Sequence, residues 1–202
     1  ANLVVHYDSN DDATIRVAQT DIANAATANL FTFPPGYERI RVAQSSDALS
    51  RDGRWLAGMA THATDGAVIF ALDLVSGVLG AQLPVAALYD GVFCVADPVW
   101  GVVEPDWIAP SPQGAHLMIQ WPRDWGEDVS DHCRGLESYD LVSGDYVGRV
   151  YDGHQHGDLG SDADGSEFFM TYALAAPPPD NGRPALARYP LPGPPAGVAA
   201  PH

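Results

Sequence analysis

The amino-acid sequence predicts an all-β fold, a β-propeller or a propeller fragment, with about four blade repeats of which the first and last are incomplete. The pentapeptide Asp-Leu-Val-Ser-Gly occurs twice, at 73–77 and 140–144, each time at the end of an apolar run. Its Ser-Gly pair supplies the positive φ that a tight hairpin requires. The 17 Pro and 20 Gly lie between short apolar runs, and no window carries a helical apolar stripe. A helical domain is therefore excluded.

The spacing of the repeats indicates propeller blades. Taking Asp21, Asp73, Asp140 and Pro190 as equivalent gives a period of roughly 50 to 67 residues, which fits a four-stranded blade with variable loops. The Pro/Ala-rich tail after the last repeat is typical of a linker or a frayed end. The predicted units are blades at about 1–45, 46–85, 86–150 and 151–193, and the tail at 194–202.

The second blade is the most regular, because Asp-Gly turns at 52–53 and 65–66 and Ser-Gly at 76–77 separate its strands. Its strands are predicted at 47–50, 55–61, 67–74 and 78–84. The first repeat is entered part-way, since the strand that should precede Asn2 is missing. We therefore expect a piece of a larger propeller rather than a closed four-bladed ring, with another chain or missing blades covering the open edge.

The charge balance restricts the partners. Asp and Glu total 26 against 10 basic residues, all of them Arg, which gives a net charge of −16. Such a chain repels nucleic acid and anionic membranes. A GC-rich genome or a high-salt habitat produces this composition. No signal peptide and no apolar run of membrane-spanning length is present. Cys94 and Cys133 fit either one disulfide between neighbouring blades or two buried thiols.

Two turn-plus-strand units, 49–57 and 108–114, look like a "Ser-Pro-Asp-Gly, then apolar strand" signature. With the paired Asp-Leu-Val-Ser-Gly strands, they resemble the WD40-like repeats of bacterial propellers that include the periplasmic Tol-system propeller and the oligogalacturonate lyases. The resemblance implies a propeller over nearly the whole chain and an extracytoplasmic location. It does not select an activity, because such propellers host many.

A candidate divalent metal site lies at His154, His156 and Asp158. In an extended segment the two imidazoles point to the same side, so they and the carboxylate could meet one ion such as Ca or Mn. Oligogalacturonate lyases similarly hold a divalent metal with His and Gln at the propeller axis, and His154, Gln155 and His156 match in residue type. The alternative is that the two histidines cap turns or hydrogen-bond to neighbouring blades. Nothing supplies the base that a lyase needs.

A candidate partner-binding loop spans 121–132, with Trp121, Arg123, Trp125 and His132 as the predicted contact residues. Exposed aromatic rings beside charged groups suit a protein or carbohydrate partner, and the alternative is that the loop covers an inter-blade groove. No nucleophile elbow or P-loop occurs. The sequence therefore favours a non-catalytic extracytoplasmic interaction or ligand-binding module that requires no cofactor. The alternatives are a metal-dependent polysaccharide lyase and a subunit of a larger assembly.

Overall fold

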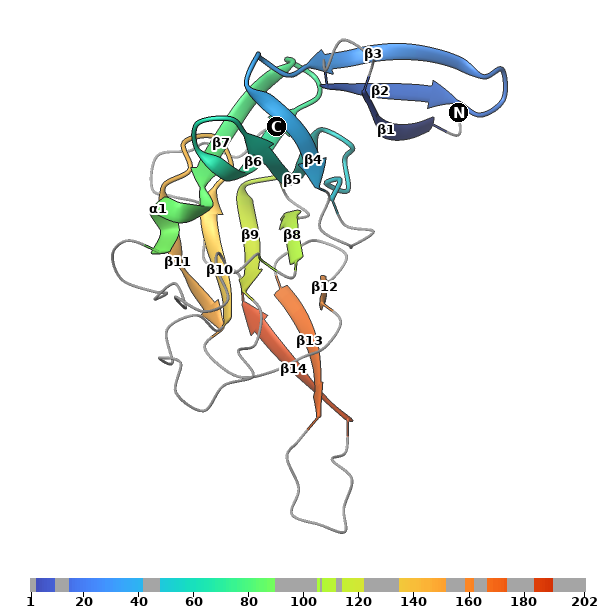
Figure 1. The fold of residues 1–202 in the computed structure, drawn as a ribbon. Coiled ribbons are helices and arrows are strands. Elements are labelled where there is room, and N and C mark those ends of the chain that lie inside the picture. Colours follow the sequence, from blue (N-terminus) through green and yellow to red (C-terminus); the bar gives the residue numbers. More distant parts are fainter. Residues whose placement is uncertain are drawn as a thin grey trace.

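The computed structural model shows a chain built mainly of antiparallel β-strands (Figure 1). This confirms the all-β prediction. The structure describes residues 3–9, 15–41, 48–89, 105, 107–111, 114–121, 135–151, 159–161, 167–173 and 184–190.

Four sheets follow one another along the chain, from the blue N-terminal sheet at the top of Figure 1 to the orange strands at the bottom. Sheet 1 contains β1 (Leu3–Ser9), β2 (Ile15–Asp21) and β3 (Ala26–Thr32). Sheet 2 contains β4 (Tyr37–Arg41), β5 (Trp55–His62), β6 (Gly66–Asp73) and β7 (Val78–Pro84), and the short helix α1 (Val85–Tyr89) follows. Sheet 3 contains β8 (Trp107–Pro110), β9 (His116–Trp121), β10 (Gly135–Asp140) and β11 (Tyr146–Tyr151). Sheet 4 contains β12 (Leu159–Ser161), β13 (Glu167–Ala173) and β14 (Pro184–Pro190).

The strand register confirms the repeat alignment made from the sequence. Each of the four marker residues ends or nearly ends a strand and pairs with the first residue of the strand before it. The pairs are Leu3 with Asp21, Trp55 with Asp73, His116 with Asp140, and Glu167 with Pro190. The two shared pentapeptides therefore occupy like positions, since β6 and β10 are both the third strand of a four-stranded sheet.

Sheets 2 and 3 have four strands, and the outer two sheets have three in the part of the chain that the structure describes. By register, the strand without an equivalent among the described residues is β4 in sheet 1 and β7 in sheet 4. This agrees with the predicted incompleteness of the first and last repeats. The second sheet nevertheless begins before the predicted boundary at 46. The strand that pairs with most of β5 is β4, and the predicted strand at 47–50 contributes one bridge, Leu49 to Leu56.

The core lies between successive sheets. Along β5, Trp55, Ala57 and Met59 pack with residues of sheet 3. The alternate residues Leu56 and Ala60 pack with residues of sheet 1. The two central strands of sheet 2 are thus buried on both faces, which explains the nearly continuous apolar sequences of β5 and β6. Each large side chain buried there contributes about 1.5–3 kcal/mol to stability.

Candidate functional site

The predicted binding loop leaves sheet 3 at Trp121, the last residue of β9. Arg123, Trp125 and His132 lie outside the described residues, as do Cys94 and Cys133. The predicted metal ligands His154, His156 and Asp158 also lie outside the described residues. Trp121 is therefore the one predicted site residue whose surroundings the structure describes.

Trp121 is buried, with 5 % of its surface exposed. The expectation that its ring is exposed is wrong. Side chains alternate along β9, so Trp121 shares a face with Leu117 and Ile119 and packs between sheets 2 and 3. Its indole N–H donates a hydrogen bond of 2.8 Å to Oε2 of Glu137. A direct role of Trp121 in binding stays a prediction; in the structure Trp121 packs in the core and hydrogen-bonds to Glu137.

Glu137 on β10 is the centre of a buried polar network, with 2 % of its surface exposed. Besides Trp121, the Tyr139 hydroxyl donates to its Oε2 at 2.8 Å, and the Arg149 guanidinium donates to its Oε1 at 3.4 Å. Burial and the adjacent Glu137 carboxylate raise the pKa of Tyr139, so its phenol stays protonated and donates. The Tyr146 ring packs edge-on against Tyr139, 5.4 Å between centroids. We call Glu137, Trp121, Tyr139 and Arg149 the Glu137 network.

Sheet 2 has no counterpart of the Glu137 network. Phe70 stands three residues before Asp73, as Glu137 stands before Asp140. The residues of sheet 2 equivalent in register to Trp121, Tyr139 and Arg149 are Ala60, Leu72 and Gln82. A buried charge costs free energy unless it is paired and hydrogen-bonded. Sheet 3 therefore carries a buried carboxylate where sheet 2 carries Phe70, and Gln82 of sheet 2 instead accepts a hydrogen bond from the Tyr37 hydroxyl.

The Glu137 network lies at the base of an enlarged connection. In sheet 2, residues 61–67 join Ala60 to Val68, whereas residues 122–134 join the equivalent Trp121 to Gly135. The register places Trp121 directly opposite Gly135, two residues before Glu137. The Trp121–Glu137 hydrogen bond thus joins β9 to β10 next to the two residues that flank the longer connection. Buried and held by three donors, the Glu137 carboxylate links β9, β10 and β11.

The sequence reasoning missed Glu137, although a signal was present. When the two Asp-Leu-Val-Ser-Gly repeats are aligned, Glu137 is equivalent to Phe70, whose neighbours are apolar. A charge at a position that is core in the sister repeat indicates either a pairing partner or a functional group.

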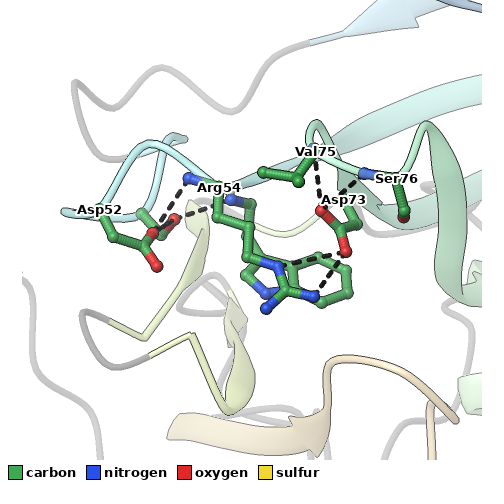
Figure 2. Close-up of polar contacts among 7 residues, drawn as sticks. Asp52, Arg54, Asp73, Val75 and Ser76 are labelled. Atoms are coloured by element: carbon green, nitrogen blue, oxygen red, sulfur yellow. Dashed lines mark hydrogen bonds and ion pairs between the residues drawn. The ribbon is translucent and has the colours of Figure 1, made fainter. Parts of the chain in front are cut away.

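A second polar cluster sits at the turn of sheet 2 (Figure 2). The Arg54 guanidinium donates to Oδ2 of Asp73 from Nε at 3.2 Å and from Nη2 at 2.8 Å, and it lies 5.6 Å from the centroid of the Trp55 ring. The backbone N–H groups of Val75 and Ser76 donate to the other oxygen, Oδ1. The hydrogen bond from Arg54 is the main cause that lowers the pKa of Asp73 from 3.8 to about 2.

Sheet 3 repeats this turn without the ion pair. Asp140 accepts from the backbone N–H groups of Val142 and Ser143 at 2.9 and 2.7 Å, but Ala115 stands where sheet 2 has Arg54. Ser50 and Ser111 likewise accept from the N–H of the first residue of β5 and of β9. The hydrogen bonds to the repeat Asp and to the preceding Ser are therefore common to sheets 2 and 3. The ion pair with Arg54 is an addition in sheet 2.

Among the described residues, no group of three or more His, Cys, Asp or Glu side chains is placed to hold a metal ion. The predicted Ca or Mn site at 154–158 falls outside those residues and stays a prediction. No helix in the described ranges is long and apolar enough to cross a membrane.

No protein-family model matches the sequence, and no curated protein matches it. Solved structures do resemble the fold. A prolyl endopeptidase structure has a TM-score of 0.51 at 14% identity, over 93% of this chain and 26% of that chain. An oligogalacturonate lyase in complex with manganese has a TM-score of 0.50 at 12% identity, over 84% and 46%. TolB from Acinetobacter baumannii has a TM-score of 0.47 at 14% identity, over 91% and 37%.

The two likenesses with a TM-score of 0.50 or above show the fold: the sheets are blades of a β-propeller. The predicted resemblance to propellers such as the oligogalacturonate lyases is confirmed for the fold. The chain spans about a quarter to a half of the length of these structures. At such identities the fold does not transfer an activity, a substrate or a metal.

Proposed function

We propose that this chain is a non-catalytic β-propeller module that binds a protein or another ligand through the connection 122–134, which joins Trp121 to Gly135 of sheet 3. The observation that carries the proposal is the hydrogen bond from the Trp121 indole to Glu137 at the base of that connection. This bond joins the two strands that the connection links, and β-scaffolds commonly carry recognition loops between such strands.

The composition of the connection supports a recognition role. It carries Trp125 together with Arg123 and Arg134, and its acidic residues are Asp124, Glu127, Asp128 and Asp131. Aromatic and Arg side chains dominate the binding energy of protein interfaces, and charges around them guide association. With a chain charge of −16, the partner that fits best presents a basic or neutral surface.

The proposal extends to location and assembly. An extracytoplasmic module suits the resemblance to the Tol-system propeller. A carbohydrate partner is also compatible with an aromatic loop flanked by carboxylates. Further blades or another chain would complete the open sheet edges.

A loop exchange tests the proposal. Residues 122–134 are replaced by the sequence 61–67, which joins the equivalent positions in sheet 2. Tagged wild-type and exchanged chains are recovered from the producing cells, and quantitative mass spectrometry compares the proteins and glycans that accompany each. We expect at least one stoichiometric companion of the wild-type chain to fall tenfold or more in the exchanged chain, whose circular dichroism and melting temperature stay close to wild type.

Trp125→Ala should reproduce most of that loss. Val75→Ala, in the exposed turn of sheet 2, is the matched control and should retain every companion. If a folded exchanged chain keeps all the companions of the wild type, the proposed role of the connection is wrong.

A further inference from the structure

The residue that follows the repeat Asp makes a similar contact where one blade meets the blade before it. Leu141, the residue after Asp140, is fully buried, and its carbonyl accepts a hydrogen bond of 2.9 Å from the backbone N–H of Ala81 on β7. Its equivalent after Asp73 is Leu74, which packs against the core that sheets 1 and 2 share. In both blades the residue after the repeat Asp therefore docks on the preceding sheet.

The site on sheet 2 that receives Leu141 is formed by a glycine of β7. Gly80 on β7 faces the Leu141 carbonyl so closely that a Cβ at Gly80 would clash with it, and that Cβ would also lie 3.2 Å from the Trp55 ring. The ladder between β6 and β7 is irregular between Phe70 and Leu72, beside this glycine. This site is thus an outer blade strand that is bulged and carries a residue without a side chain.

Sheet 1 retains the same docking turn. The backbone N–H of Ala23 donates to Oδ1 of Asp21 at 2.9 Å, as Val75 donates to Asp73. Ala25 adopts a φ of 56°, close to the 66° of Gly77 at the same place. A left-handed alanine costs about 1–2 kcal/mol, so the turn keeps its shape against local preference.

The docking residue of this turn, Ile22, is 61 % exposed, whereas its equivalent Leu141 is fully buried. A second feature of sheet 1 is the outer edge of β1. By register β1 is the equivalent of β5, which pairs with β4 on its other side. In the described residues β1 pairs with β2 alone.

The outward face of sheet 1 is compatible with burial although it is polar. His6 Nε2 and Thr20 Oγ1 are 2.9 Å apart, and Thr20 Oγ1 lies 2.8 Å from Thr27 Oγ1, so the three side chains satisfy one another across the sheet. The corresponding face of sheet 3 buries the Glu137 network against sheet 2. A hydrogen-bonded polar face is therefore an established way for this chain to meet a preceding blade.

We infer that sheet 1 docks on a further propeller blade that comes before it in the repeat array, with Ile22 seated beside a glycine or another small residue of that blade's bulged outer strand. The direction follows from the two observed contacts, because Leu74 and Leu141 both dock on the blade that precedes them in sequence. The open edge of β1 accepts the first strand of its own blade. The inference concerns this surface and is independent of the loop proposed to bind partners.

Photocrosslinking tests the inference in the protein as its own cells make it. A benzophenone amino acid replaces Ile22, the cells are irradiated, and the crosslinked peptides are sequenced by mass spectrometry. We expect one dominant crosslink, to a strand encoded upstream of Leu3 that carries a small residue at the contact. Benzophenone at Val142, whose Cα lies 3.3 Å from the position of a Cβ on Gly80, is the positive control and should crosslink to β7.

Val75, 80 % exposed in the equivalent turn of sheet 2, is the negative control. The inference is overturned if the crosslink yield at Ile22 is no higher than at Val75. It is also overturned if the peptide captured at Ile22 comes from another polypeptide, or from a segment that is not a blade strand.

Discussion

The indole nitrogen of Trp121 lies 2.8 Å from the Glu137 carboxylate, in a sheet whose neighbour has Ala60 and Phe70 at the same two places. Equivalent positions of two blades are thus filled by a hydrogen-bonded polar pair in one and by apolar residues in the other. Breaking one partner of a buried charged pair is strongly destabilising, whereas replacing the whole set by apolar residues is often neutral. The network in sheet 3 is therefore not required for a blade to form, which is why we connect it with the loop that it anchors.

Truncating Glu137 should destabilise the protein severely. Glu137→Ala leaves the Arg149 guanidinium and the Trp121 and Tyr139 donors buried without their acceptor. The expected loss is about 3–5 kcal/mol in the free energy of unfolding, measured by urea denaturation. Glu137→Gln, which keeps the shape and one acceptor oxygen, should lose less. A loss below about 1 kcal/mol for Glu137→Ala would mean that the network does not hold the sheet.

Replacing the whole Glu137 network by apolar residues of similar volume should restore stability but not binding. The fourfold variant Trp121→Phe, Glu137→Met, Tyr139→Phe and Arg149→Met removes every polar member of the network. We expect its free energy of unfolding to lie within about 2 kcal/mol of wild type, because all members of the polar set leave together and no large cavity is left. Its recovery of partners should nevertheless fall as in the loop exchange. A variant that is stable and keeps full binding would show that the Glu137 network is not needed for partner binding.

Much of the fold could be predicted from the sequence because the repeats mark its register. The shared pentapeptide sets Asp73 and Asp140 at the ends of equivalent strands, and the weaker marker Pro190 pairs as they do. The boundary before sheet 2 was not predictable in the same way. The strand β4 (Tyr37–Arg41) carries two Arg and a Glu, so it lacks the apolar alternation by which the other strands were found.

The environment of the candidate site was less predictable. Trp121 precedes a polar run beginning with Pro122 and Arg123, which suggests exposure, yet its parity with Leu117 and Ile119 decides that it faces the core. For Glu137, local sequence does not reveal the face, because Leu136, Ser138 and Tyr139 are buried on both sides of β10. In a two-sided sheet, polarity alone does not identify the exposed positions.

The Arg54–Asp73 ion pair should make stability depend on acid pH. Because the folded pKa of Asp73, about 2, lies below its ordinary 3.8, the contribution is fully present above about pH 4. It is lost as the pH falls through the folded pKa. Arg54 is 43% exposed, which weakens the pair, so about 1–2 kcal/mol is expected. Arg54→Ala copies Ala115 of sheet 3 and should lose that amount at pH 7.

The measurement compares urea unfolding of wild type and Arg54→Ala between pH 7 and pH 2. The difference between the two proteins should shrink below pH 4 and approach zero near pH 2. A difference that stays constant over this range would assign the effect to packing of Arg54 on the Trp55 ring rather than to the charge on Asp73.

The metal site predicted at His154, His156 and Asp158 is tested by composition. If these side chains share one ion, the protein purified without chelator should carry about one Ca or Mn per chain by plasma mass spectrometry. His154→Ala and His156→Ala should each lower that content at least tenfold. His6→Ala, in sheet 1, is the matched control and should not change it. Metal absent from wild-type protein, even after incubation with Ca and Mn, would end the lyase alternative.

The contact between sheets 2 and 3 predicts a position-specific effect of adding one methyl group. Gly80→Ala forces a Cβ against the Leu141 carbonyl and the Trp55 ring, and it strains the hydrogen bond from Ala81 to Leu141. Overpacking of this kind costs about 1–3 kcal/mol, and hydrogen exchange should rise at the Ala81 amide. Gly148→Ala is the matched control, since it lies on the corresponding strand of sheet 3 with nothing within 4 Å of the added atom. It should change stability by less than about 0.5 kcal/mol, and equal losses at the two glycines would contradict blade docking through Gly80.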